Sequence, residues 1–255
     1  MTQRSLEGRV ALVTGGAKRV GRAIALKLAS AGMDVAITYR RSKAEAGEVA
    51  RAIEAMGRSS LAIEADFADP AAVDAVDAAF TARFDRLDAL VNNASIFAPA
   101  SLEAITVEIF QQNMAVNALA PLLLIQRFAD RLGADYREQD PTSPGRIVNF
   151  IDIHVMGEPL TGYTAYNASK AALMEITHSL AMELAPRVTV NALAPGVVAW
   201  AEQYTEQMKR DYLQRVPLAR PGTPDDAADA ALFLVRDANY CTGQIIRLDG
   251  GRLLT

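Results

Sequence analysis

Two side chains that could transfer a proton lie four residues apart late in the chain. Tyr166 and Lys170 occur in the segment YNASK, within a stretch of helical pattern from Ala165 to Leu184. Residues at positions i and i+4 lie one above the other on a helix face. An ammonium group that close stabilises a phenolate and lowers the pKa of a tyrosine. The pair therefore predicts a site for acid–base chemistry near neutral pH, although most pairs at this spacing are ordinary surface neighbours.

A glycine-rich segment near the N-terminus could hold phosphate groups. Residues 14–21 read TGGAKRVG and lie between an apolar run of strand length, Arg9–Gly15, and a helical stretch, Gly21–Ala31. Glycines allow a tight turn and a close approach to a pyrophosphate, and the start of a helix supplies free N–H groups. A plain turn with a helix cap has the same composition. The position at the first strand–helix junction of an alternating chain favours dinucleotide binding.

The end of the second predicted strand indicates which dinucleotide is bound. An NAD-binding chain usually has Asp or Glu here, to accept a hydrogen bond from the ribose 2′-hydroxyl. This chain instead has Arg40, Arg41 and Ser42, which suit a 2′-phosphate. The alternative is a solvated basic helix start. We expect NADP(H), and Asp66 either accepts from the adenine amino group or caps the next helix.

A carboxylate ends the fifth predicted strand, one element before Tyr166. Asp152 follows the strand Arg146–Ile151. Reduction of a C=N bond needs a proton on nitrogen as hydride reaches the adjacent carbon, and a carboxyl group beside a tyrosine can relay that proton. A serine at the same position would polarise a carbonyl, but its hydroxyl is a poor proton source. Asp152 therefore favours C=N chemistry, unless its side chain points to water.

Short apolar runs alternate with helical stretches along the whole chain. The remaining predicted strands are Val35–Tyr39, Ser60–Ala65, Ala89–Asn92, Val188–Leu193 and Gln244–Leu248, and the remaining predicted helices are Lys43–Met56, Pro70–Phe84, Leu102–Leu132 and Asp225–Val235. This alternation predicts an α/β fold, a Rossmann-type doubly wound parallel sheet of about seven strands with helices on both faces. Residues 1–255 are expected to form one domain.

Composition excludes several functional classes. Apolar residues make up 51% of the 255, and 26 basic against 30 acidic residues give a net charge of −4, so neither nucleic acid nor an anionic membrane is an expected partner. One cysteine and two histidines cannot form a thiolate-rich zinc site, and we expect no metal. No apolar run is long enough to span a bilayer, and the first residues do not resemble a signal peptide. The expected location is the cytoplasm.

Taken together, the motifs resemble those of the short-chain dehydrogenase/reductase family over nearly the whole chain. They comprise Thr14–Gly21, Asn92-Asn93-Ala94, Asn117, the Tyr166–Lys170 pair, Asn191–Gly196 and Asp249-Gly250-Gly251. The resemblance implies that Tyr166 donates the proton, that Lys170 holds the nicotinamide ribose and tunes the tyrosine, and that Asn117 keeps a water in a proton relay. It places the carboxamide of the nicotinamide at the backbone of Pro195, Gly196 and Val197. The remaining cofactor positions that it implies are Gly15, Val20, Gly21, Asn93 and Ala94.

Three departures from the usual family pattern resemble its pteridine reductase branch, which includes bacterial dihydromonapterin reductases. Arg19 replaces a glycine, Ser95 replaces another, and Asp152 replaces a serine. The resemblance implies that Arg19 and Ser95 contact cofactor phosphate and pterin. It also implies that Phe97 stacks opposite the nicotinamide and that Asp152 assists Tyr166. The branch is expected to have 13 residues from this Asp to the Tyr, where this chain has 14, so the segment Ile153–Leu160 is expected to hold one extra residue.

The leading hypothesis is therefore an NADPH-dependent reductase that transfers hydride to a C=N bond of a dihydropterin-like heterocycle. One alternative is a carbonyl reductase of the same family, acting on a 3-oxoacyl thioester, a small ketone or a sugar. A remote alternative is a non-catalytic NADP-sensing regulator. The sequence leaves the roles of His154, Tyr163 and Trp200 open, between lining the site and packing. By resemblance, the helices Leu102–Leu132 and Ala165–Leu184 are expected to build a homotetramer.

Overall fold

A computed structural model describes residues 5–140, 142, 144–200 and 204–255 of the chain. Seven parallel strands form one sheet in the order β3-β2-β1-β4-β5-β6-β7. Their bounds are β1 (Val10–Val13), β2 (Asp34–Tyr39), β3 (Ser60–Glu64), β4 (Ala89–Asn92), β5 (Gly145–Phe150), β6 (Val188–Pro195) and β7 (Ile245–Leu248). The predicted fold class is confirmed.

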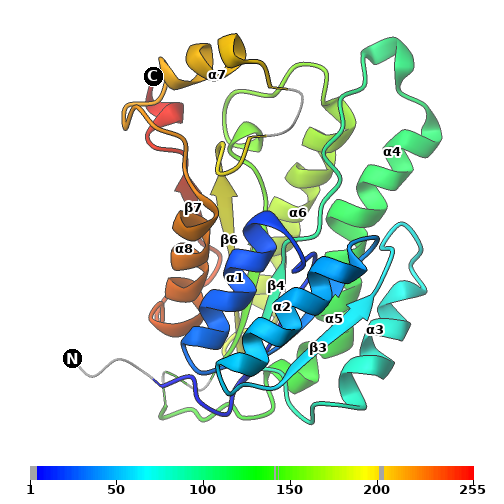
Figure 1. Ribbon diagram of the computed structural model, residues 1–255, viewed down its shortest axis with the longest axis vertical. Coiled ribbons are helices and arrows are strands. Elements are labelled where there is room, and N and C mark those ends of the chain that lie inside the picture. Colours follow the sequence, from blue (N-terminus) through cyan, green and yellow to red (C-terminus); the bar gives the residue numbers. More distant parts are fainter. Residues whose placement is uncertain (1–4, 141, 143, 201–203) are drawn as a thin grey trace.

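The strands β1, β4 and β5 are buried along their whole length, as expected for a parallel sheet covered on both faces. The strand order grows outward in opposite directions from β1 and β4, so their carboxyl ends form the crevice where open α/β sheets bind ligands. In Figure 1 the arrow of β6 points upward, which places the carboxyl ends of the strands at the upper edge of the molecule.

Helices cover both faces of this sheet (Figure 1). They are α1 (Arg19–Ser30), α2 (Lys43–Ala55), α3 (Ala72–Thr81), α4 (Val107–Met114), α5 (Ala120–Leu132), α6 (Thr164–Glu183), α7 (Glu206–Leu213) and α8 (Pro224–Arg236). Helices α1, α2 and α8 pack apolar side chains on one face. Helices α3 and α5 close the core of the other face.

The predicted long helix Leu102–Leu132 is wrong in detail, because the segment contains two breaks. A 3-10 turn at Leu102–Ala104 precedes α4, which begins after the cap Thr106. A π-helical segment, η2 (Ala115–Leu119), then separates α4 from α5. Pro121 explains this wider turn, because it has no N–H to donate to the carbonyl of Asn117 and its ring crowds that carbonyl.

The other predicted helices and strands agree with the structure to within three residues at each end, but α7 was not predicted. Its sequence, EQMKRDYL, is short and mostly polar, and none of its residues is buried in the structure, so its pattern is too weak to predict a helix.

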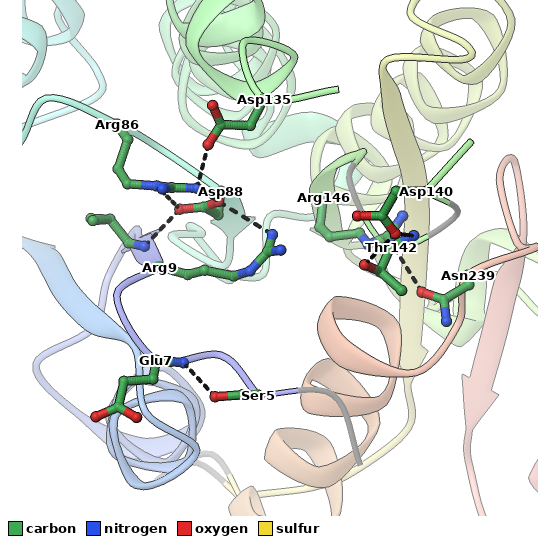
Figure 2. A network of polar contacts seen from close by, with 11 residues as sticks. Ser5, Glu7, Arg9, Arg86, Asp88, Asp135, Asp140, Thr142, Arg146 and Asn239 are labelled. Carbon is green, nitrogen blue, oxygen red and sulfur yellow. Dashed lines mark hydrogen bonds and ion pairs between the residues drawn. The ribbon is translucent and has the colours of Figure 1, made fainter. Parts of the chain in front are cut away.

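Polar contacts tie the amino ends of the central strands together (Figure 2). The Asp88 carboxylate, directly before β4, accepts from the backbone N–H of Val10 at 2.8 Å and from two nitrogens of Arg86 at 2.8 and 2.6 Å. Arg146 of β5, only 2% exposed, donates to Asn239 at 2.9 Å. This network lies at the opposite edge of the sheet from the crevice, so it sets strand register without entering the site.

Within the described ranges, no helix has both the length and the apolar character needed to cross a membrane. The same residues contain no group of three or more His, Cys, Asp or Glu side chains arranged to hold a metal ion.

Candidate active site

The glycine-rich turn after β1 packs directly against the end of β4. A Cβ atom at Gly21 would lie 2.2 Å from the carbonyl oxygen of Gly15, so only glycine fits at position 21. Gly15 has a φ of +64°, in the left-handed region. The Asn93 side chain donates to the carbonyls of Thr14 and Gly15 at 2.9 and 3.2 Å, and the Thr14 hydroxyl accepts from the N–H groups of Asn93 and Ala94. These contacts hold open a concave surface at the start of α1.

A wide cleft of about 740 Å³ runs along this surface. Its lining includes four cationic side chains, those of Lys18, Arg19, Arg40 and Arg41. The cleft also borders the predicted cofactor positions Gly15, Val20, Gly21, Asn93, Ala94 and Gly196.

Asp66 and Ser42 are the two remaining residues at this end that the sequence predicts as cofactor contacts, and only Asp66 lines the cleft. Asp66 lines the cleft, accepts from the backbone N–H of Ala68 at 3.1 Å and lies 3.9 Å from Arg40. Its carboxylate thus stabilises a turn and still borders the cleft. Ser42 is the N-cap residue of α2 and is not among the residues that line the cleft.

Arg19 adopts a backbone conformation that favours glycine, with a φ of +50°. Its guanidinium crosses the site and donates to the carbonyl oxygens of Ala199 at 2.8 Å and Trp200 at 3.0 Å. The side chain therefore connects the turn after β1 to the segment after β6. It also borders both the wide cleft and the smaller pocket described next.

Tyr166 and Asp152 meet in an inner pocket of about 230 Å³. The Tyr166 hydroxyl donates to Oδ2 of Asp152 at 2.7 Å, and Oδ1 of Asp152 accepts from the backbone N–H of His154 at 2.9 Å. Tyr166 is 5% exposed. The carboxylate thus points to the tyrosine rather than to water, even though 14 residues separate the two.

Lys170 lies beneath this pair. Its Nζ donates to the carbonyl oxygen of Phe150 at 2.7 Å and lies 5.9 Å from the centroid of the Tyr166 ring. Burial lowers the pKa of Lys170 to about 8, and the negative charge of Asp152 partly offsets this change. At neutral pH the side chain is an ammonium group.

The sequence analysis expected Lys170 to lower the pKa of Tyr166, and this expectation is wrong. The pKa of Tyr166 is raised well above its usual value, first by burial and then by the charge and hydrogen bond of Asp152. Lys170 is bonded to a backbone carbonyl rather than to the phenol, so the stabilisation that its ammonium gives a phenolate does not outweigh burial and Asp152. Tyr166 therefore keeps its proton at neutral pH and can act as a donor.

Phe97 lies at the boundary of the cleft and the pocket, and its side chain lines both. Its ring is stacked on Tyr163, with centroids 4.5 Å apart and an interplanar angle of 20°. It meets Tyr166 edge to face at 4.9 Å. Because Phe97 is still 37% exposed, a planar ligand can contact this aromatic group.

Asn117 is fully buried in the π-helical segment η2. Its side chain accepts from the N–H of Ile96 at 2.8 Å and donates to the Ile96 carbonyl at 3.1 Å and to Ser169 at 2.9 Å. The hydroxyl of Ser95 donates to it at 3.1 Å. The carboxamide thus fixes the loop after β4, and Asn117 is not among the residues that line either cavity.

Tyr212 of α7 is a site residue that sequence analysis missed. Its hydroxyl accepts from the N–H of Val197 at 3.0 Å, and a Cβ at Gly196 would lie 2.7 Å from the same oxygen. Trp200 meets the Tyr212 ring edge to face at 5.6 Å. This tyrosine holds the Pro195–Val197 turn in place. No signal in the polar α7 sequence separates it from a surface tyrosine.

Comparisons with known proteins agree with this architecture. A family model described as enoyl-(acyl carrier protein) reductase matches residues 15–252. The 3-oxoacyl-[acyl-carrier-protein] reductase of Synechocystis is 36% identical, covering 98% of this chain and 99% of that protein. Pteridine reductase 1 of Leishmania tarentolae is 34% identical, with 96% of each chain covered. The crystal structure of a short chain dehydrogenase from Burkholderia cenocepacia in complex with NADP superposes with a TM-score of 0.89 at 38% identity, covering 98% of this chain and 100% of that one.

The buried lysine gives a testable titration. We expect Lys170 to titrate near its pKa of about 8, and Asp152→Asn to lower that pKa further, because the aspartate charge favours the ammonium form. Nuclear magnetic resonance of protein labelled at the lysine ε-carbons measures both values. Glu175→Gln, an exposed change on the same helix, is the control and should leave the titration unchanged. An identical lysine pKa in the Asp152→Asn variant would contradict the placement of this carboxylate.

Proposed function

Because the chain belongs to the short-chain dehydrogenase/reductase family, we propose that it is an NADPH-dependent reductase that transfers hydride to a C=N bond of a dihydropterin-like heterocycle. The observation that carries this proposal is the 2.7 Å hydrogen bond between Tyr166 and Asp152 in the inner pocket. It pairs a buried tyrosine with a carboxyl group that can relay a proton to it, and reduction of a C=N bond needs a proton on the ring nitrogen. The similarity to pteridine reductase 1 supports the same choice.

The residues around the wide cleft fit an NADP(H) cofactor. Gly15 and Gly21 line the cleft at the start of α1, and the N-terminus of a helix is suited to binding a pyrophosphate. Arg40 and Arg41 offer two guanidinium groups for a 2′-phosphate at the far end. Bound there, NADPH would supply the hydride. We treat residues 1–255 as one domain built around this cleft.

The protein's own residues would deliver the proton. Tyr166 retains its proton because its pKa is raised, so it can donate to a ring nitrogen that accepts a proton as the adjacent carbon receives hydride. The nearby ammonium of Lys170 stabilises the negative charge that the tyrosine would then carry. A proton taken up from water at Asp152 can then pass to the tyrosine oxygen along their hydrogen bond. Phe97 offers a partly exposed ring to a flat substrate.

A carbonyl reductase is the second candidate. The Synechocystis relative is a 3-oxoacyl-[acyl-carrier-protein] reductase, and the Tyr166–Lys170 pair is also suited to protonating a carbonyl oxygen. Asp152 distinguishes the two candidates, because a serine hydroxyl is enough to polarise a carbonyl, whereas a carboxyl group can relay a proton to a ring nitrogen. The remote hypothesis of a non-catalytic regulator is set aside, since the tyrosine and the lysine are both present and buried together.

Cofactor preference gives the first prediction for this function. We expect NADPH to bind at least about tenfold more tightly than NADH, because one charge-assisted phosphate contact contributes ~1.5–3 kcal/mol. Replacing both Arg40 and Arg41 with alanine should remove most of the preference, whereas Arg51→Ala, an exposed change on α2, should retain it. Titration of cofactor fluorescence measures the dissociation constants. Equal binding of NADPH and NADH by the unmodified protein would sink this prediction.

Asp152→Ser separates the two candidate reactions. If the carboxyl group delivers protons to nitrogen, this change should reduce turnover of dihydrobiopterin by about 10²–10⁴-fold and should spare an activated ketone. Tyr166→Phe should abolish both activities. NADPH oxidation at 340 nm, followed with each substrate, measures the rates. If Asp152→Ser affects dihydropterin turnover no more than ketone turnover, the carbonyl reductase reading replaces the first.

We also propose that four copies associate through α4, η2 and α6. A shallow apolar groove of about 510 Å³ lies there, lined by side chains that include Phe110, Met114, Leu119, Leu122 and Ile176. Phe110 and Leu119 are 42% and 40% exposed, and burying such a surface against a second copy is favourable.

The assembly is tested by light scattering at micromolar concentration. We expect a tetramer, and we expect Phe110→Glu to give smaller species because a carboxylate is costly to bury in an apolar interface. Met56→Glu, an equally exposed apolar position at the end of α2, should leave the mass unchanged. A monomeric unmodified protein would refute this proposal.

A further inference from the structure

The proposed mechanism gives no role to His154, one of the polar side chains of the inner pocket. His154 lines this pocket together with Asp152, Tyr166, Leu160 and Tyr204. Its Nδ1 lies 2.7 Å from the carbonyl oxygen of Glu158. A carbonyl oxygen can only accept a hydrogen bond, so Nδ1 carries the hydrogen. In the neutral ring, Nε2 then has a free lone pair and is an acceptor.

Both residues of the contact between His154 and Glu158 are held by further hydrogen bonds. The backbone N–H of His154 donates to Asp152, so the imidazole and the proton-delivering carboxylate are held on the same short turn. The carboxylate of Glu158 is bound by Arg215 at 2.7 Å and by Arg252 at 2.9 Å. These ion pairs restrict the segment that carries the carbonyl bonded to Nδ1 of His154.

The second ring nitrogen has no hydrogen-bonding partner among residues 5–140, 142, 144–200 and 204–255. Other polar side chains also line the pocket, and the hydroxyls of Ser95 and Tyr204 can donate as well as accept. Tyr166, Lys170 and Arg19 present donors, and the Asp152 oxygens already accept from Tyr166 and from a backbone N–H. Nε2 of His154 thus adds to this wall of the pocket a nitrogen that can accept a hydrogen bond.

We propose that His154 determines substrate specificity by accepting, at Nε2, a hydrogen bond from an N–H or O–H group beside the reacting bond. This inference rests on the proposed function and deepens it. A dihydropterin carries ring N–H and amino donors, whereas a 3-oxoacyl thioester has no such donor next to its ketone. The acceptor therefore favours an amino-substituted heterocycle over the thioester.

Two substitutions separate the two nitrogens of His154. Asparagine can replace the Nδ1 contact to Glu158 but loses the acceptor at Nε2. Glutamine reaches further and can present an oxygen near the Nε2 position. The other histidine of the chain, His178, lies on α6 with its side chain 42% exposed, so His178→Asn is the matched control.

Two bicyclic ligands, one with N–H hydrogen-bond donors and one without, test the proposed acceptor. Pterin (2-amino-4-oxopteridine) carries N–H donors, and 1,3-dimethyllumazine has none. Calorimetry on the NADP⁺-loaded protein should show that His154→Asn weakens pterin binding about five- to tenfold and leaves dimethyllumazine binding unchanged. His154→Gln should bind pterin within about twofold of the unmodified protein, and His178→Asn should change neither ligand. Equal weakening of both ligands by His154→Asn would overturn the proposal.

A second pair keeps this test separate from the proposed function. Turnover of dihydrobiopterin by the unmodified protein reports on pterin reduction alone. The ketones 2-hydroxyacetophenone and 2-methoxyacetophenone differ by one O–H donor, and their KM values test His154 whether or not pterins are reduced. We expect His154→Asn to raise KM for the hydroxyketone only. If the unmodified protein prefers the donor-bearing member of neither pair, the inference about His154 is wrong.

Discussion

The close approach of Gly21 to the carbonyl of Gly15 is the constraint on which the site depends. No side chain fits between them, so the turn after β1 can fold back onto the end of β4 only with glycine at position 21. Asn93 then satisfies the carbonyls that this turn exposes, and the Thr38 hydroxyl of β2 accepts from the N–H of Gly15 at 3.1 Å. Three neighbouring strands thereby fix one loop. The cationic end of the cleft and the catalytic pocket keep their relative positions because both are built on these strand ends.

Burial and charge act together in the inner pocket. An isolated buried ammonium is unfavourable, and the lowered pKa of Lys170 reflects that cost. Asp152 partly offsets it and at the same time raises the pKa of Tyr166, so one carboxylate keeps the lysine charged and the tyrosine protonated. Its second oxygen is bonded to the backbone of His154, which prevents the carboxylate from turning to water. Tyr166, Lys170 and the turn that carries His154 thus all depend on one carboxylate, that of Asp152.

Sequence analysis predicted the sheet and the cofactor cleft, because both depend on spacing and strand ends that a periodic pattern reveals, whereas the pairing of Asp152 with Tyr166 was implied by the family resemblance. Sequence analysis failed where the answer depended on three-dimensional contacts. The i, i+4 spacing of Tyr166 and Lys170 shows proximity, but it does not show that the ammonium bonds to the Phe150 carbonyl or that burial dominates both pKa values. The break at Asn117 did have a signal, since Pro121 lies four residues later. Tyr212 had none, because it acts from a short helix whose sequence is mostly polar.

The clamp between Asp88 and the backbone of Val10 joins positions 78 residues apart in the sequence. Because the ribosome makes the chain from its N-terminus, β1 cannot pair with β4 until β4 has been synthesised. Until then, one edge of β1 remains unpaired. The catalytic end waits longer, because β6 and its turn follow about a hundred residues after β4. Long-range pairing of this kind slows folding. During synthesis, the nucleotide half of the sheet can thus be complete before the chemistry of the site exists.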